Sequence, residues 1–175
     1  MKVTLQLATS IDGFIARRDG SFDWCFTDQD YGMSEFAHSV DAVIMGRHSY
    51  ELMLEMGELP YPDKPYYVLT HEQLRADQPN VTFFAGDAEA LRMKMVTEGT
   101  KHAWLFGGSN VCGQFAQRGL IDDVMIAVHP IALGQGIPLF RDLMHDVKLK
   151  LKDTRNYDTG LVMLHYQVVR TARKA

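Results

Sequence analysis

Short hydrophobic runs recur along the chain and are separated by segments with a different periodicity. Val3, Leu5 and Leu7 alternate with polar residues over 2–8, which is typical of a strand with one buried face. Residues 41–46 form a compact apolar run that ends in a glycine, which is typical of a strand buried on both faces. Further strands are predicted at 66–70, 81–84, 102–106 and 123–133.

Helical spacing of apolar residues predicts helices between these strands, at 30–39, 47–56, 87–97 and 111–118. Asp87 is the predicted N-cap of the third helix, and Gly119 is the predicted stop of the fourth. The last two alternating segments, 147–151 and 161–169, are predicted to pair as an antiparallel hairpin.

This order of elements predicts an α/β fold. Strands that alternate with helices form a largely parallel sheet covered on both faces, here with a C-terminal antiparallel hairpin. Neither an internal repeat nor a linker-like segment is visible, so residues 1–175 are predicted to form one domain. Ligands of such sheets bind at the carboxyl ends of the strands. The residues that follow each strand are therefore the first candidates for a site.

Composition narrows the classes of function. The 175 residues include 18 basic and 22 acidic side chains, for a formal net charge of −4. Such a chain is a poor electrostatic partner for nucleic acid or for an anionic membrane. The two cysteines cannot form a disulfide framework, and neither a signal peptide nor a membrane span is visible. The chain is therefore expected to be cytoplasmic.

Three predicted strands end in residues that suit phosphate groups. The first is followed by Gly46 and by a helix that opens with Arg47, His48 and Ser49. Free N–H groups and the helix dipole favour an anion at such a helix start, and an arginine can clamp a phosphate. The alternative is that Gly46 only ends a strand and that Arg47 is a solvated surface residue.

The other two strand ends are weaker signals when taken alone. Thr70 and His71 place a hydroxyl and an imidazole after the second of these strands. The third strand runs into a glycine pair and a helix start, with the outline of a phosphate cradle: Gly107, Gly108, Ser109 and Asn110. Gln114 stands where a P-loop requires lysine, so this is no P-loop. Taken alone, each segment is better explained by an ordinary turn. No metal-binding motif occurs, so no metal is predicted.

Seven short motifs follow one another along nearly the whole chain. They are SIDGFI at 10–15, DAVIMGRHSYE at 41–51, YVLT at 67–70, WLFGGS at 104–109, LIDD at 120–123, PIALGQGIPLF at 130–140 and YDTGLVMLHY at 157–166. In this order they resemble the dihydrofolate reductase-like superfamily. More closely, they resemble the C-terminal reductase domain of the bifunctional riboflavin biosynthesis enzymes (the RibD family), as a stand-alone member.

The resemblance implies a three-layer α/β/α fold with a mixed, mainly parallel sheet, and an NADPH-dependent reductase that forms a homodimer. It implies that the cofactor phosphates lie against Gly46, Arg47, His48, Ser49, Gly107, Gly108, Ser109 and Asn110. Thr70 and His71 would face the adenosine 2′-phosphate. Ala8 and the turn 10–13, which includes Asp12, would border the nicotinamide.

The implied reaction is hydride transfer to a C=N or C=O bond of a small heterocycle. The nearest known activity is 5-amino-6-(5-phosphoribosylamino)uracil reduction. The chain departs from that family in three places. Phe106 stands where an acidic residue usually precedes the glycine pair, the stretch 54–60 lacks the usual Asp-Asp-Pro, and no zinc deaminase motif is present.

Two carboxylates are candidate proton donors. Asp30 lies 15 residues before Met45 (45 − 30), which is the spacing of the carboxylate in folate reductases, and Glu35 follows on the same predicted helix. Either would act as an acid if burial raised its pKa, and an ordered water is a further candidate donor. The alternative for Asp30 is an N-cap or a solvated loop carboxylate. Trp24 and Tyr31 are candidates to stack on a flat substrate ring, or else simply pack in the core.

Two other functions stay open. A pterin or dihydrofolate reductase is favoured by the spacing of Asp30 alone. A catalytically silent nucleotide-binding module is favoured by Phe106 in place of the acidic residue.

Overall fold

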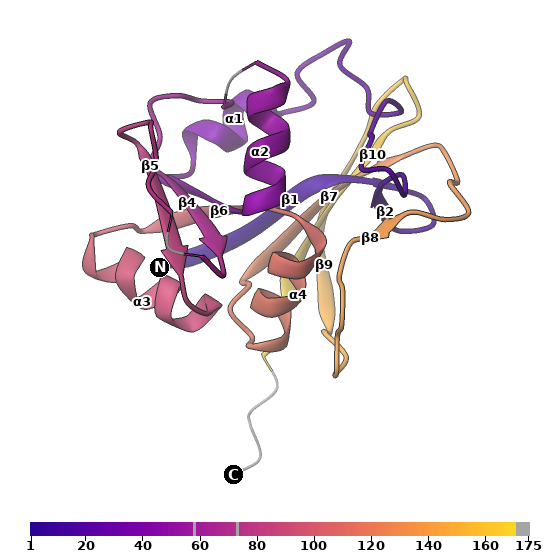
Figure 1. Cartoon of the computed structure of the whole chain (residues 1–175). Helices are drawn as coiled ribbons and strands as arrows, with labels where there is room; N and C mark the ends of the chain where they lie inside the picture. The colour runs from indigo at the N-terminus through magenta and orange to yellow at the C-terminus, as the bar shows by residue number, and fades with distance from the viewer. Residues whose placement is uncertain (58, 73, 171–175) are drawn as a thin grey trace.

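The computed structural model describes residues 1–57, 59–72 and 74–170 (Figure 1). Its large sheet contains the strands β1 (Lys2–Ser10), β3 (Ala42–Gly46), β4 (Tyr66–Thr70), β5 (Val81–Ala85), β6 (His102–Gly107), β7 (Asp123–His129), β9 (Leu149–Asn156) and β10 (Val162–Val168). A separate small sheet pairs β2 (Phe14–Ala16) with β8 (Ile137–Pro138).

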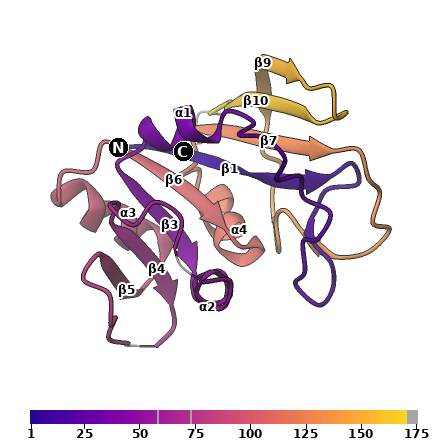
Figure 2. The same cartoon turned by 90° about the horizontal axis from the view of Figure 1, so that it is seen from above.

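The strand order of the large sheet is β5-β4-β3-β6-β1-β7-β10-β9, which can be followed in Figure 2. Every pair from β5 to β7 is parallel, whereas β10 pairs antiparallel with both β7 and β9. The predicted mixed, mainly parallel sheet with a C-terminal hairpin is thereby confirmed.

Helices cover both faces of the sheet and complete three layers. The helices α3 (Ala88–Thr97) and α4 (Ser109–Gln117) lie on one face, and α1 (Met33–His38) and α2 (Arg47–Glu55) lie on the other (Figure 1). Phe115 of α4 packs with Leu5 and Ile44 in one core cluster. Phe36 and Tyr50 pack with other strand residues in a second cluster on the opposite face.

The predicted boundaries hold best where a local signal marks them. The Asp87 carboxylate accepts a hydrogen bond of 2.8 Å from the Ala90 N–H, so this residue caps α3 as predicted. The first predicted helix is shorter than expected and begins at Met33 instead of residue 30. Tyr31 and Gly32 precede it with φ angles of 51° and 80°, and this left-handed backbone cannot continue a helix.

Two predicted strands also differ in extent. The strand β7 ends at His129 instead of residue 133, because Pro130 lacks the N–H that a ladder needs. The strand β9 runs to Asn156, well past the predicted end at 151. All of its residues are exposed, so none of its positions has to be apolar. The second half therefore lacks the apolar and polar alternation by which a strand is predicted.

Phe115 offers a test of the packing that holds α4 on the sheet. Its side chain is fully buried, so Phe115→Ala should lower the free energy of unfolding by about 3–5 kcal/mol. Urea denaturation followed by circular dichroism measures the change. Met93→Ala on α3 is the control, because Met93 is 71% exposed and the expected loss is below about 0.5 kcal/mol. Equal losses in both variants would contradict this packing.

Candidate functional site

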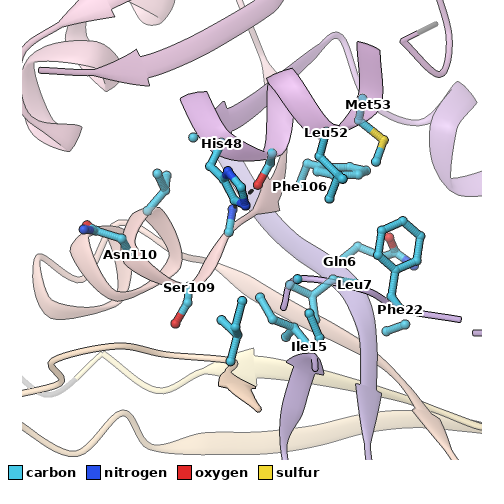
Figure 3. A pocket seen from close by; sticks show the side chains of 18 of the residues that line it. Gln6, Leu7, Ile15, Phe22, His48, Leu52, Met53, Phe106, Ser109 and Asn110 are labelled. Atoms are coloured by element: carbon cyan, nitrogen blue, oxygen red, sulfur yellow. Dashed lines mark hydrogen bonds between the residues drawn. The ribbon is translucent and has the colours of Figure 1, made fainter. Parts of the chain in front are cut away.

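A cavity of about 850 Å³ lies at the carboxyl ends of four neighbouring parallel strands. Ala8 of β1, Gly46 of β3 and Thr70 of β4 line it, together with Gly108 directly after β6. This is the edge at which parallel sheets bind ligands, and the volume lies in the usual range of roughly 300–1,000 Å³ for small-molecule sites. Figure 3 shows side chains from several elements around this space.

The N-termini of α2 and α4 both open into the cavity. The N-cap residues Gly46 and Gly108 provide no side-chain cap, so the first N–H groups of each helix lack that partner. Ser109 at the start of α4 is buried, and its Oγ finds no hydrogen-bond partner among the described residues. Two uncapped helix starts and an unpartnered buried hydroxyl form a suitable environment for an anion.

Two glycines allow these helix starts to approach each other. The Gly108 N–H donates a hydrogen bond of 3.0 Å to Ser49 Oγ, and a Cβ at Gly108 would lie only 3.2 Å from that oxygen. A Cβ at Gly46 would lie 3.1 Å from Val111 Cγ2. The peptide bond between Gly107 and Gly108 is cis. A side chain at either helix start would push α2 and α4 apart or fill the cradle between them.

Arg47 at the mouth of the cavity is already held by two carboxylates. Its Nε donates to Glu51 at 2.7 Å, and its Nη1 donates to Glu72 at 2.7 Å. These hydrogen bonds, first that to Glu51 and then that to Glu72, raise the pKa of Arg47. The Glu72 N–H in turn donates to Thr70 Oγ1 at 3.1 Å. Without a ligand, the positive charge of Arg47 is therefore already paired with the carboxylates of Glu51 and Glu72.

Sequence reasoning singled out neither of these partners. Glu51 has a usable signal, because it lies four residues after Arg47 on one helix, where opposite charges pair. Glu72 has none, because a loop carries it and only the fold brings it to Arg47.

The far half of the cavity has an apolar lining. Leu52, Met53, Phe22 and Phe106 lie there, on the side away from Ser109 (Figure 3). Burial, with the charge of the neighbouring Asp23, raises the pKa of the Cys25 thiol in this half to about 11. That thiol is therefore uncharged at neutral pH.

His129 also lines the cavity, next to Phe26, and is buried. The Phe26 N–H donates to its Nε2 at 3.1 Å, so Nδ1 carries the proton and donates to the Ala127 carbonyl at 3.1 Å. Burial lowers its pKa. His129 is thus a neutral ring with both nitrogens occupied, and it ties the segment around Phe26 to β7.

Most of the residues predicted for cofactor and substrate binding meet at this one cavity. Those that line it are Ala8, Tyr31, Gly46, Arg47, His48, Ser49, Thr70, His71, Gly108, Ser109 and Asn110. Outside the lining lie Asp12, Trp24, Asp30, Glu35 and Gly107. Gly107 nevertheless lies next to the cavity, because it directly precedes the lining residue Gly108.

The two predicted proton donors are both exposed. The Asp30 carboxylate accepts hydrogen bonds from Ser34, 2.6 Å from Oγ and 3.0 Å from the backbone N–H, and these bonds lower the pKa of Asp30. A proton donor at neutral pH needs a shift in the other direction. Glu35 borders a second cavity of about 260 Å³ and lies 3.6 Å from Arg155.

Asp12 and Trp24 are held by contacts within the protein. The Asp12 carboxylate accepts a hydrogen bond of 2.6 Å from Ser10 Oγ and one of 2.7 Å from the Gly134 N–H, which fastens the turn after β1 to a distant loop. Trp24 is buried with its ring edge-on to His129, at 5.2 Å between centroids. The ring of Tyr31, by contrast, lines the cavity, and its hydroxyl donates to Asp28 at 2.7 Å.

Two further properties concern the described part of the chain as a whole. Within residues 1–57, 59–72 and 74–170, no three His, Cys, Asp or Glu side chains come together as a metal site would require. Over the same ranges, no helix combines the length and the apolar character needed to cross a bilayer.

The fold and the glycine-rich cradle define a class of protein. The chain belongs to the RibD C-terminal domain family, whose model matches residues 1–163, and the resemblance seen in its motifs is thereby confirmed. Two relatives in Bacillus subtilis are the uncharacterized proteins YwjB and YyaP. They are 38% identical over 169 residues and 31% identical over 176 residues, and each match covers 94% of this chain. The matches cover 97% of YwjB and 94% of YyaP.

A longer relative is the riboflavin biosynthesis protein RibD of Corynebacterium ammoniagenes. It is 28% identical over 167 residues, which are 86% of this chain and 48% of that protein. Among solved structures, a putative riboflavin biosynthesis protein from Shewanella sp. PV-4 is similar with a TM-score of 0.88, 26% identity and coverage of 97% of this chain and 100% of that one.

The bifunctional deaminase and 5-amino-6-(5-phosphoribosylamino)uracil reductase of Thermotoga maritima shows the same fold. Its TM-score is 0.75 at 17% identity, over 96% of this chain and 56% of that one. The fold is thus that of the reductases of riboflavin biosynthesis.

Proposed function

We propose that this protein is an NADPH-dependent reductase of a small heterocyclic compound, most like 5-amino-6-(5-phosphoribosylamino)uracil reductase in its fold and in its handling of the cofactor. One observation carries the proposal. The N-termini of α2 and α4, with the unpartnered Ser109 Oγ between them, face a cavity whose far half is apolar. A nicotinamide dinucleotide has two matching parts, since its phosphates are anionic and its nicotinamide ring is flat.

The residues present fit such a cofactor. The N–H groups at the start of α4 and the Ser109 hydroxyl would hold the pyrophosphate, and Ser49 would support the cradle from α2. Thr70 and His71 line the same end and would face the adenosine 2′-phosphate. Ala8 is a small residue at the border with the apolar half, so a flat nicotinamide ring could lie against it.

When bound, a reduced nicotinamide supplies the hydride for a C=N or C=O bond. The chain's own contribution is position and environment. Apolar side chains such as Leu52 and Phe106 exclude water from the far half, and the cradle holds the phosphates at a fixed distance from it. Reduction also needs a proton. The sequence predicted Asp30 and Glu35 as donors, but neither lines the cavity, and the Asp30→Asn variant tests the role of Asp30.

Homodimer formation also stays a prediction. The strand β9 forms one edge of the sheet with all its residues exposed, which supports the idea that a second copy pairs there.

The pterin or dihydrofolate reductase alternative has lost its support, because it depended on Asp30, whose side chain lies outside the cavity lining. The silent nucleotide-binding module keeps one supporting observation, since the apolar ring of Phe106 lines the cavity where the family usually has an acid. Binding of NADPH without turnover on any reducible substrate would favour that module.

Calorimetric titration with NADPH and NADH tests the cofactor site directly. NADPH should bind more tightly than NADH, and Gly108→Asp should abolish binding of both, because it places a side chain and a negative charge in the cradle. Met93→Asp is the control, because it adds the same negative charge on α3 at a position that is 71% exposed and outside the cavity lining. It should bind both nucleotides like the parent protein. Absence of binding to either nucleotide would refute the proposed function.

Glu72 is expected to weaken NADPH binding. Its carboxylate occupies Arg47 and adds a negative charge beside the residues that would face the 2′-phosphate. Because both side chains are solvent-exposed, Glu72→Gln should tighten NADPH binding only about two- to fivefold and leave NADH unchanged. Glu55→Gln, an exposed change on α2, is the control. Weaker NADPH binding by Glu72→Gln would show instead that Glu72 positions Arg47 for the ligand.

Asp30→Asn separates two roles of this carboxylate. A proton donor should lose about 10²-fold or more in turnover. The hydrogen bonds to Ser34 and the lowered pKa instead lead us to expect a change of at most about threefold once a substrate is found. Single-turnover kinetics under saturating NADPH measure the hydride step. A loss of about 10²-fold with unchanged NADPH affinity would restore Asp30 as the donor.

A further inference from the structure

Gln6 is a largely buried residue whose carboxamide makes few hydrogen bonds within the described protein. It lies on β1, is only 5% exposed and lines the apolar half of the cavity. Its Nε2 donates to Met33 Sδ at 2.9 Å, and a thioether is a weak acceptor. No hydrogen bond to its Oε1 occurs among the described residues. This oxygen is not among the enclosed atoms that lack a partner, so it is open to the cavity, and a molecule that enters the cavity can complete the hydrogen bonds of the amide.

The backbone of Gln6 is fixed even though its side chain lacks good partners. Trp104 Nε1 donates to the Gln6 carbonyl oxygen at 2.9 Å, and β1 is hydrogen-bonded between β6 and β7. The carboxamide is therefore presented from a rigid strand. Figure 3 shows it beside Leu7 and Phe22, on the side of the cavity away from Ser109 and Asn110.

The surroundings of this amide suit a flat ring. Phe22, Phe26, Phe106 and Met33 line the same half of the cavity. Aromatic and thioether side chains pack well on the faces of a heterocycle. A carboxamide offers one donor and one acceptor side by side, which complements the N–H and C=O of a lactam.

The positive charges of the cavity lie at its other end. Within the described ranges, the arginines that line it are Arg47 at the start of α2 and Arg141, whose N–H donates to the Ser109 carbonyl at 3.3 Å. In the half around Gln6, His129 is neutral and the Cys25 thiol has a pKa of about 11.

Among the described residues, the nearest other cations are Lys2 and Arg155, which border the second cavity and are already paired with Asp123 and with Glu35 and Asp153. A phosphate group buried beside Gln6 would have to break such a pair to gain a counter-charge, which is unfavourable.

We propose that Gln6 determines substrate specificity, and that the substrate is a neutral, flat heterocycle whose lactam edge binds the Gln6 carboxamide and which carries no phosphate. This inference rests on the proposed reductase function and narrows its substrate class. It separates this chain from a reductase of phosphoribosyl compounds.

Two flavins with the same tricyclic lactam ring test the proposal. Lumiflavin is neutral, whereas FMN carries a ribityl phosphate on the ring. Each is titrated by fluorescence into the protein saturated with NADP⁺, which prevents turnover. Lumiflavin should bind, and FMN should bind at least about tenfold more weakly.

Gln6→Met keeps the length of the side chain and removes its hydrogen-bonding groups. It should weaken lumiflavin binding about three- to tenfold and leave the calorimetric Kd for NADPH unchanged. Gln167→Met makes the same change at an exposed position on β10 and should alter neither value. Gln6→Asn, which retains the carboxamide, should bind lumiflavin better than Gln6→Met.

The outcomes separate this inference from the proposed function. Equal or tighter binding of FMN, undiminished lumiflavin binding by Gln6→Met, or failure of lumiflavin to bind a protein that binds NADPH would each overturn the inference alone. Failure to bind NADPH would remove the proposed function and, with it, the inference.

Discussion

The close approach of α2 and α4 is the constraint on which the rest of the site depends. Each helix follows one of two adjacent parallel strands, β3 and β6, so the sheet delivers both helix starts to the same place. The Gly108 N–H bonded to Ser49 Oγ joins them, and neither Gly46 nor Gly108 leaves room for a Cβ without displacement of a neighbour. The positive ends of two helix dipoles therefore lie close together. A P-loop, by contrast, relies on one helix start and on the charge of a lysine side chain. An anion bound there, as proposed, would be held mainly by backbone N–H groups, so a chain with a net negative charge could still offer an anion site.

The two halves of the cavity are built in different ways. The half at the starts of α2 and α4 consists of backbone N–H groups and small residues that directly follow the strands. Short contiguous motifs therefore encode it. The apolar half is assembled from side chains on β1, on α2 and on the segment around Phe22 and Phe26, which the chain order separates widely. A heterocycle would touch residues from all of these elements at once. The first half can stay the same while the second changes, which is how one fold can serve several substrates.

The same distinction explains what could be predicted from the sequence. The mixed, mainly parallel sheet, the capping of α3 by Asp87 and the gathering of Gly46, Thr70 and Gly108 at one sheet edge follow from local signals and from a resemblance of motifs. The position of Asp30 does not, because spacing along the chain ignores the left-handed turn at Tyr31 and Gly32 that delays α1. The contact between Arg47 and Glu72 and the isolation of the Gln6 amide arise only when distant segments pack. No periodicity or motif encodes either of them.

The electrical neutrality of the apolar half has a consequence for the chemistry. His129 is held neutral by burial and by two backbone partners, and the Cys25 thiol keeps its proton up to a pKa of about 11. Among the described residues, the charged groups of the cavity instead gather at the helix starts and at the Arg47 carboxylate cluster. If the proposed reductase function holds, a charge that develops on a substrate in the apolar half would be poorly screened by the protein and would interact strongly with the charge of a bound cofactor. Stabilisation of that charge would then fall to the cofactor ring and to the carboxamide of Gln6, which among the described residues bonds only to the weak acceptor Met33 Sδ.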